Sequence, residues 1–177
     1  MCGKCAAIRQ PFAAFHDFNK RGVDVTSKTL IDELIYRSAL LMDSKDFAGF
    51  LDLCDPAFNY SITAYIPEIR KETAWLEQNK EGMKLLFDTL PRHNSDHASL
   101  SRHLTVYTVE QDEAAKQAKT ISFLQAFKTS LDGGATELFA VGKVHDTISL
   151  SGDKPLLLSR NVRLETRLLG IGFHIPL

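Results

Sequence analysis

Apolar residues follow a helical spacing near the start of the chain. In the stretch that begins at Ser27 they recur every three or four positions on one stripe, while charged residues take the other faces. Thr26 or Ser27 supplies the N-cap oxygen that such a helix needs. Residues 46–53 keep this spacing and stop at Asp55-Pro56, because the residue before a proline avoids helical backbone angles. The pattern therefore predicts two helices in the first third of the chain.

The spacing then changes to that of a strand. Apolar and polar residues alternate over residues 58–64, and Pro67 closes this strand. Residues 71–90 return to helical spacing, with Gly82 as a break, and Pro91 ends the predicted helix. The second half of the chain alternates again, which predicts four long strands over residues 100–110, 119–129, 137–150 and 154–168.

Glycines shape the predicted sheet. Residues 132–134 and 151–153 offer the positive φ angles that tight hairpins require. Gly142 lies in the middle of a strand, where we expect a bulge or kink that curves the sheet. Helices followed by long strands predict an α+β fold, in which N-terminal helices pack on one face of a strongly curved antiparallel sheet. Long strands that curl around a helix are expected to form a cone with an internal cavity.

Residues 1–26 lack a regular period and are predicted to form an N-terminal arm ahead of a single domain, residues 27–177. The arm carries a phenylalanine at every third position: Phe12, Phe15 and Phe18. Three exposed phenylalanines would be a liability in water. We therefore expect the arm to dock on its own domain or on a neighbouring subunit.

Composition narrows the choice of partners. The 177 residues include 21 basic and 22 acidic side chains, a formal net charge of -1, with no basic block to neutralise a nucleic-acid backbone. A net charge this close to zero gives little protection against association, which favours a surface that is partly covered by a protein partner. No apolar run approaches the ~20 residues that cross a bilayer, and cysteines are sparse. We expect a cytoplasmic protein that binds neither nucleic acid nor membrane.

Two cysteines near the N-terminus have the spacing of a zinc or redox pair. Cys2 and Cys5 lack a second pair of ligands, however, since Cys54 is single and has no neighbouring cysteine or histidine. A redox pair is also expected at the start of a helix that follows a strand, where the helix dipole lowers the thiol pKa. We interpret Cys2 and Cys5 as an uncommitted pair.

Histidines gather in the middle of the chain beside two carboxylates: His93, His97, His103, Asp88 and Asp96. Two histidines and one carboxylate on a shared face bind non-haem iron. Pro91 and Asn94 mark most of this stretch as a loop, however, which leaves the side chains without a shared face. We favour a solvated or interface loop over a metal site.

A general base inside the cone is the alternative to a purely structural role. His103 and His145 are the candidates, with Asp43 or Tyr60 as a partner. The simpler interpretation, which we favour, is that one of these histidines only satisfies a backbone carbonyl.

The last predicted strand carries three arginines. Arg163 and Arg167 share a face with Glu165, and this charged face suits solvent or a subunit contact. Arg160 falls among apolar residues, so it fits there only if it is paired.

Five segments, in their order and spacing, carry a family resemblance: LIDELIYRSALLMDSKDFAGFLDL, FNYSITAYIPEIR, SRHLTVYTV, VRLETRLLG and GFHIPL. From about residue 27 to residue 177 the chain resembles the small (beta) subunits of Rieske-type aromatic-ring-hydroxylating dioxygenases. Within that group it looks most like the small hydroxylase subunits of methanesulfonate monooxygenases. The arm with its CGKC and the EQDEAAKQAK hairpin depart from the family pattern. The resemblance implies the cone-shaped fold of the nuclear transport factor 2 (NTF2) and ketosteroid isomerase group.

The resemblance also implies a division of labour. In such hydroxylases the large (alpha) subunit holds the [2Fe-2S] Rieske cluster and the mononuclear Fe(II), so no catalytic, cofactor-binding or metal-binding residue is expected in this chain. It implies a structural subunit of an α3β3-type assembly with contacts between beta subunits. A reductase and a ferredoxin would bring electrons from NADH, and O2 would be the oxidant.

A free-standing isomerase, dehydratase or cyclase of the same fold, with a cavity His or Asp as general base, is the alternative function. This alternative is supported if His103 or His145 lies in an apolar pocket within hydrogen-bond reach of a carboxylate. The alternative is excluded if three phenylalanines fill the cavity: Phe123, Phe127 and Phe139.

Overall fold

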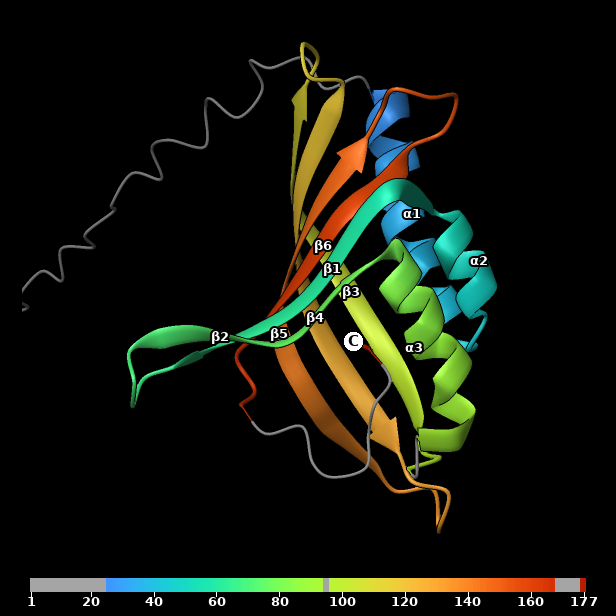
Figure 1. Cartoon of the computed structure of the whole chain (residues 1–177), viewed down its shortest axis with the longest axis vertical. Coiled ribbons are helices and arrows are strands. Elements are labelled where there is room, and N and C mark those ends of the chain that lie inside the picture. The colour runs from blue at the N-terminus through green and yellow to red at the C-terminus, as the bar shows by residue number, and fades with distance from the viewer. Residues whose placement is uncertain (1–24, 94–95, 168–175) are drawn as a thin grey trace, which may run out of the picture.

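Three helices and six strands make up the described part of the chain (Figure 1). The computed structural model describes residues 25–93, 96–167 and 176–177. The helices are α1 (Val25–Asp43), α2 (Phe47–Asp52) and α3 (Lys80–His93). The strands are β1 (Cys54–Ile66), β2 (Lys71–Asn79), β3 (Ser99–Asp112), β4 (Gln117–Thr129), β5 (Thr136–Ser149) and β6 (Leu156–Leu164).

The first two helices form where the apolar spacing predicts them. α1 buries a stripe that includes Ile31 and Ile35. Asp46 caps α2, because its side chain accepts a hydrogen bond from the Gly49 amide at 2.9 Å. α1 begins at Val25, so both predicted N-cap residues lie inside its first turn and that cap prediction is wrong.

The strands form one mixed sheet in the order β2-β1-β6-β5-β4-β3. The predicted antiparallel meander from β3 to β6 is confirmed. β1 and β6, however, run parallel. The prediction of a purely antiparallel sheet fails at this pair. In the sequence, α3 and the strands β3 to β5 separate β1 from β6, and this long connection returns the chain in the same direction as β1.

Residues 71–79 form a strand and not the predicted helix. β2 pairs antiparallel with β1 along its whole length, and a short turn over residues 67–70 joins the two strands. The backbone ladder to β1 overrides a local spacing that suits either element. β2 is also an edge strand, and most of its side chains are exposed on both faces.

Helix α3 therefore starts later than predicted, and it ends later as well. Asn79 caps it, since its Oδ1 accepts a hydrogen bond from the Gly82 amide at 2.8 Å. Gly82 lies in the first turn and does not break the helix. Pro91 lies inside the last turn, and α3 continues to His93. One missing amide donor so near the end does not unwind the last turn.

Gly142 is required by a close approach of two strands. A Cβ atom at this position would lie 2.5 Å from the carbonyl oxygen of Arg163 and 3.1 Å from the Cα of Leu164. The register between β4 and β5 shifts instead between Ala126 and Phe127. The β4–β5 register is therefore regular at Gly142, where a bulge or kink was predicted, and the absence of a side chain there lets β5 and β6 pack together.

The two predicted glycine turns have different outcomes. Gly133 and Gly134 adopt φ angles of 75° and 66° in the turn between β4 and β5, as predicted. Gly152 does not adopt a positive φ. Six residues join β5 to β6, and a loop of that length turns without one.

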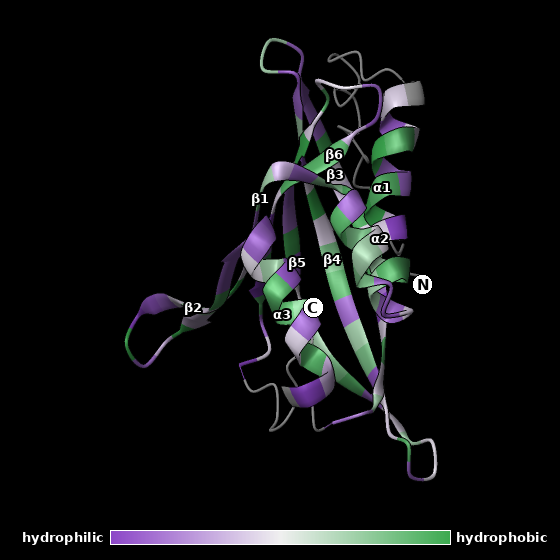
Figure 2. Cartoon of the chain, turned by 45° about the vertical axis from the view of Figure 1, so that its right-hand side comes forward, coloured by the Kyte–Doolittle hydropathy of each residue, from purple (hydrophilic) through white to green (hydrophobic). Residues whose placement is uncertain are grey.

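The sheet curls around the helices and the core lies between the two layers. The helices cover the inner face of the sheet (Figures 1 and 2), which confirms the predicted α+β layout. One cluster of buried apolar residues fills this space. The hairpin of β1 and β2 projects away from the rest of the molecule (Figure 1).

Candidate functional site

Four polar residues form a row across the inner face of the sheet. The strand register places Thr120 beside Asp146, Asp146 beside Arg160, and Arg160 beside Tyr60. Partners in register share a face of the sheet, so the four side chains point into the cone. All four are buried. This row is a polar seam inside an otherwise apolar core.

Arg160 and Asp146 form a two-point ion pair at the centre of the row. Arg160 Nε lies 2.8 Å from Asp146 Oδ1, and Arg160 Nη2 lies 2.9 Å from Oδ2. Burial lowers the pKa of Arg160, but the charge and hydrogen bonds of Asp146 outweigh burial and raise it above its usual value. The prediction that Arg160 must be paired on the apolar face is confirmed.

Arg102 is a second buried arginine, and sequence reasoning missed it. Its backbone amide and Nη1 both donate to the carboxylate of Asp43 at the end of α1, at 2.9 and 2.5 Å. Its Nη2 donates to the carbonyl oxygen of Pro176 at 2.5 Å. Burial lowers its pKa, and the charge of Asp43 opposes this. The available signal was its inward position between Leu100 and Leu104 on an alternating strand.

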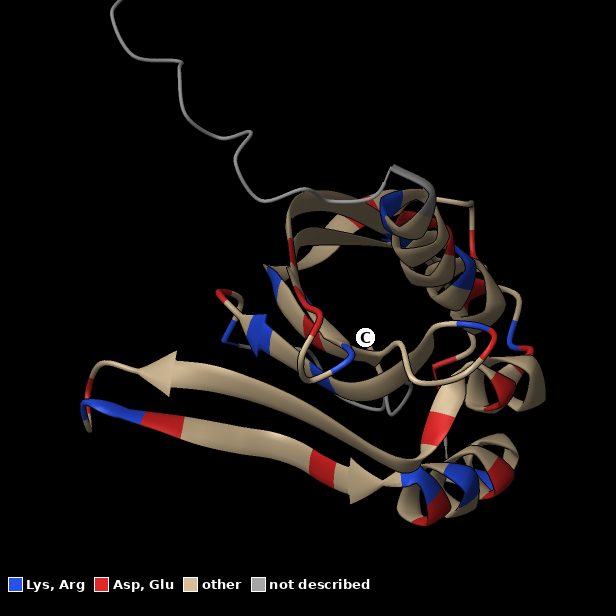
Figure 3. Cartoon of the chain, turned by 90° about the horizontal axis from the view of Figure 1, so that it is seen from above, with Lys and Arg blue, Asp and Glu red and all other residues tan. Residues whose placement is uncertain are grey.

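Tyr60 holds the end of the chain inside the cone. Its hydroxyl donates to a backbone oxygen of Leu177 at 2.5 Å. Pro176 and Leu177 are both buried, and the C-terminus lies between the sheet and the helices in all three views (Figures 1, 2 and 3). Burial raises the pKa of Tyr60 above its ordinary value. Residues of this chain therefore occupy the place where a cavity was predicted.

Cys54 lies near Arg160 and Asp146, and its thiol is unreactive. Its thiol is buried and donates to the carbonyl oxygen of Phe50 at 3.3 Å. Burial raises the pKa of the Cys54 thiol to about 12. A thiol that stays neutral at physiological pH is neither a nucleophile nor a metal ligand.

We expect the free energy of unfolding to fall as the pH rises above about 9. Unfolding restores the ordinary pKa values, 9.0 for Cys54 and 10.0 for Tyr60, so the unfolded chain loses these protons first. The stability that these groups contribute is fully present below pH 9. Each group then removes about 1.4 kcal/mol per pH unit until its folded pKa is reached.

Urea unfolding of the full chain between pH 8 and pH 11 measures this decline. Cys54→Ala should reduce the slope above pH 9, and Tyr60→Phe should reduce it above pH 10. Comparing slopes avoids confusion with the constant cost of each substitution. Slopes identical to that of the unsubstituted chain would contradict the assignment.

His103 and His145 do not face the interior. Both alternate with inward-facing residues on their strands and lie on the outer face of the sheet. The His103 ring packs edge-on against Phe127 with centroids 5.3 Å apart, and its polar neighbour is the Ser101 hydroxyl rather than a backbone carbonyl. The alternative of a histidine base inside the cone therefore does not hold for His103 or His145. Of its suggested partners, Asp43 binds Arg102 and Tyr60 binds Leu177.

Two of the three phenylalanines that would have filled the cavity lie outside it, and Phe139 packs against the edge of the core. Phe123 and Phe127 are on the outer face, and Phe123 stacks on Tyr107 with centroids 6.1 Å apart. Phe139 is half-buried, with Lys128 Nζ 5.4 Å from its ring centroid. Other apolar side chains of the core, the polar row and Pro176 with Leu177 occupy the interior instead.

The predicted metal candidates do not come together. Within residues 25–93, 96–167 and 176–177, no group of three or more His, Cys, Asp or Glu side chains is arranged to hold a metal ion. His97 is exposed, and Asp96 accepts hydrogen bonds from the Ala98 amide and from Lys128. The thiols of Cys2 and Cys5, the arm phenylalanines and the His93 side chain lie outside the described residues.

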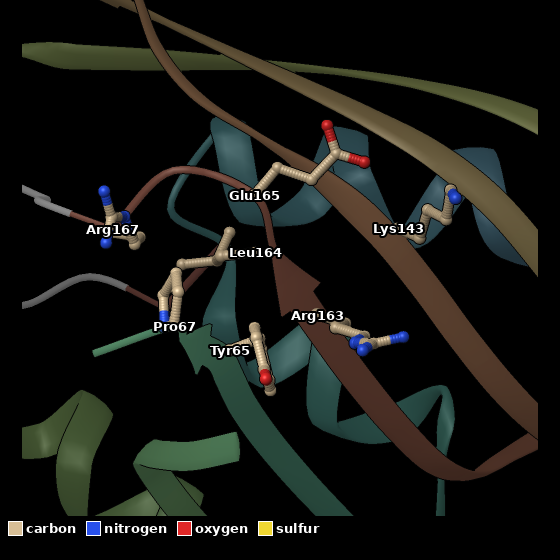
Figure 4. Close-up of a pocket in the computed structure, with 7 residues that line it drawn as sticks. All are labelled: Tyr65, Pro67, Lys143, Arg163, Leu164, Glu165 and Arg167. Carbon is tan, nitrogen blue, oxygen red and sulfur yellow. The ribbon is translucent and has the colours of Figure 1, made fainter. Parts of the chain in front are cut away.

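A pocket of about 470 Å³ lies on the outer side of the sheet, at the root of the β1–β2 hairpin. Arg163 Nε lies 3.2 Å from Glu72, and Arg167 Nη1 lies 2.7 Å from Glu68. Both arginines are about half exposed. Arg163 lies on the outer face of β6, as predicted, but the strand ends at Leu164, so the predicted strand face does not extend to Arg167. The lining residues are Tyr65, Pro67, Lys143, Arg163, Leu164, Glu165 and Arg167 (Figure 4).

Charged residues elsewhere are spread over the helices, the turns and parts of the strands (Figure 3). None of the helices in the described ranges has the length and apolar character needed to cross a membrane.

Comparison with solved structures supports the fold. The beta subunit assigned to an aromatic-ring-hydroxylating dioxygenase from Novosphingobium aromaticivorans superposes with a TM-score of 0.72. The match covers 86% of this chain and 97% of that one at 19% identity. At such low identity the likeness shows the fold alone, and it is the predicted NTF2-like cone.

Sequence comparison gives the family, although no family model matches the chain. The hydroxylase beta subunit of methanesulfonate monooxygenase from Methylosulfonomonas methylovora is 38% identical over 150 residues, which covers 81% of this chain and 83% of the relative. The beta subunit of 2-aminobenzenesulfonate 2,3-dioxygenase from an Alcaligenes species is 27% identical over 148 residues, 83% of this chain and 97% of the relative. The chain therefore belongs to the beta-subunit family of the ring-hydroxylating and sulfonate oxygenases.

Proposed function

We propose that this chain is the structural beta subunit of a multicomponent Rieske non-haem iron oxygenase that oxidises methanesulfonate with NADH and O2. The observation that carries the proposal is the 38% identity, over most of both chains, to the beta subunit of methanesulfonate monooxygenase. Both named relatives belong to enzymes of sulfonates, which supports a sulfonate substrate. The subunit domain of this cytoplasmic α3β3-type assembly begins with α1 at Val25, two residues before the predicted boundary at residue 27.

The described residues do not fit an iron centre. A Rieske cluster requires two cysteines and two histidines on one [2Fe-2S] unit. Cys54 is the single cysteine of the described ranges, and its thiol is buried and neutral. We therefore assign the Rieske cluster and the mononuclear Fe(II) to the large alpha subunit, which ferredoxin and reductase supply with electrons. This chain contributes no catalytic residue.

The β1–β2 hairpin is the proposed contact with the large subunit. It projects from the body (Figure 1), and its apolar side chains Tyr65, Ile69 and Trp75 are 46%, 62% and 50% exposed. Aromatic anchors surrounded by charged residues are typical of protein interfaces. The ion pair of Arg163 with Glu72 supplies such charges at the hairpin.

Trp75→Ser is expected to reduce the amount of large subunit retained by the tagged chain about tenfold or more, because exposed tryptophans anchor interfaces. Quantitative co-purification from co-expressing cells measures the loss. Leu131→Ser is the matched control, since Leu131 is 72% exposed in the turn between β4 and β5, away from the hairpin. Equal retention by the two variants would show that the hairpin is not the contact.

An omission experiment tests the function itself. The large subunit, this chain, ferredoxin and reductase are combined with NADH, O2 and methanesulfonate, and sulfite release is measured as each component is left out. We expect no turnover by this chain alone, and loss of turnover when the large subunit is absent. Turnover by the isolated chain contradicts the proposal. Oxidation of 2-aminobenzenesulfonate in place of methanesulfonate overturns the substrate assignment only.

A further inference from the structure

Helix α1 has an exposed face with a groove along it. The opposite face of α1 packs against β3 and α2, while Tyr36 and Leu40, one helical turn apart, are 47% and 67% exposed. Large apolar side chains that share an exposed face are typical of an interaction surface. The groove has a volume of about 760 Å³, and its lining residues are Thr29, Asp32, Glu33, Tyr36, Arg37 and Leu40.

A carboxylate oxygen in this groove lacks a donor. Asp32 Oδ1 is buried and has no hydrogen-bond partner among the residues that the structure describes. Buried polar atoms are rarely left unpaired, since each costs free energy. Glu33 lines the groove beside Asp32, so the end of the groove nearer the start of α1 is acidic. The segment that fits this groove therefore brings both apolar side chains and a basic donor.

The chain carries such a segment directly before α1. Phe12, Phe15 and Phe18 are followed by Lys20 and Arg21, all in the part of the chain that the structure does not describe. Side chains three positions apart lie on one side of a helical turn, so the three rings can contact one surface together. An arginine is also well suited to a carboxylate that is removed from water. The segment thus offers both kinds of group that the groove requires.

The segment reaches the groove of its own chain. Val25, the first residue of α1, is seven positions after Phe18, and seven residues span up to about 24 Å. The helix from Val25 to Leu40 is about 22 Å long, so the whole groove is within reach. A short tether also gives an effective concentration in the millimolar range, which favours the groove of the same chain over that of a neighbour.

We propose that residues 12–21 bind the α1 groove of their own chain. The three phenylalanine rings cover Tyr36 and Leu40, and Arg21 donates a hydrogen bond to Asp32 Oδ1. This contact covers the apolar face of α1 and pairs the buried oxygen. The inference goes beyond the subunit function and does not depend on it, because the contact lies within one chain.

Cross-linking of the full chain tests the contact. Ala14→Cys places a thiol among the phenylalanines, and Arg37→Cys places a second thiol at the groove. Cys2→Ser and Cys5→Ser remove the other thiols of the arm, and Cys54 is buried and neutral. A short bismaleimide links thiols that lie close together. Mass spectrometry of the digested monomer then measures the yield of the link within one chain.

The expected result is an intrachain link between the two positions. The yield should exceed that of a control pair, Ala14→Cys with Lys143→Cys, about fivefold or more. Lys143 is exposed on the outer face of the sheet, away from α1. Equal yields from the two pairs overturn the proposal. A covalent dimer in place of the intrachain link also overturns it, because the segment then binds a neighbouring copy.

The phenylalanine rings are tested in the same assay. Phe15→Ser should lower the yield of the intrachain link about threefold or more, because it removes apolar surface from the contact. Asn19→Ser is the matched control and should leave the yield unchanged. Equal yields from these two variants contradict the proposed role of the rings.

Two further substitutions test the hydrogen bond of Arg21. Arg21→Gln and Asp32→Asn should each lower the yield, and the double variant should lower it no further than either one, because both remove the same contact. Arg9→Gln, which changes a basic residue on the other side of the phenylalanines, should have no effect. Independent, additive losses would show that Arg21 does not bind Asp32. None of these results bears on the outcome of the omission experiment.

Discussion

Asp146→Ala is expected to lower the free energy of unfolding by about 3–5 kcal/mol, the largest effect of any single substitution considered. The substitution leaves the Arg160 guanidinium buried without the carboxylate that meets it at 2.8 and 2.9 Å. An uncompensated buried charge costs far more than the ion pair itself contributes. Urea unfolding at pH 7, monitored by far-ultraviolet circular dichroism, measures the loss of free energy of unfolding.

Two controls make the result specific. The double variant Asp146→Leu, Arg160→Met removes both charges and should recover most of the lost stability, because it leaves no charge unpaired. Arg167→Ala breaks the exposed pair with Glu68 and should change the stability little, since solvent screens that pair. If the double variant is as unstable as Asp146→Ala, shape and not charge explains the effect.

Gly142→Ala is expected to destabilise the fold by about 3 kcal/mol, at the upper end of the usual cost of overpacking. Its Cβ would lie 2.5 Å from the carbonyl oxygen of Arg163, an atom of the β6 backbone that cannot rotate away. The strands β5 and β6 must then separate where Gly142 pairs with Leu164. Thermal unfolding and loss of the hydrogen-exchange protection of β6 amides are the measurements.

Gly152→Ala is the matched control for Gly142. The nearest atom to a Cβ at Gly152 is the carbonyl oxygen of Lys154 at 3.9 Å, an ordinary contact, and Gly152 has no positive φ. The control should leave the stability unchanged or raise it slightly, because alanine restricts the unfolded chain more than glycine does. A Gly142→Ala variant as stable as this control would contradict the close approach of β5 and β6.

Elements with a strong, sustained period could be predicted from the sequence, whereas pairing partners could not. The long stripe of α1 and the alternation of β3, β4 and β5 decide those elements locally. Residues 71–79 suit a helix or a strand, and only the hydrogen bonds to β1 decide between them. The parallel pairing of β1 with β6 likewise depends on contacts between residues about a hundred positions apart.

The interior of the cone likewise combines a feature that the sequence predicts with contacts that it does not predict. Arg160 was predicted to need a partner because its apolar neighbours on β6 leave it no solvent-facing position. The identity of that partner, Asp146, required the register between β5 and β6. The placement of Pro176 and Leu177 on Tyr60 and Arg102 has no local signal in the sequence, since it joins segments 117 and 74 positions apart.

The most direct test of the subunit assignment is purification of the tagged full chain from cells that express it with its native partners. We predict that a larger chain accompanies it, with iron and acid-labile sulfide in the ratio of about three to two that one [2Fe-2S] cluster and one mononuclear iron imply. The hallmark of the Rieske cluster in the electron paramagnetic resonance spectrum should belong to that larger chain. Recovery of this chain alone, free of iron and able to turn over a substrate by itself, would contradict the assignment.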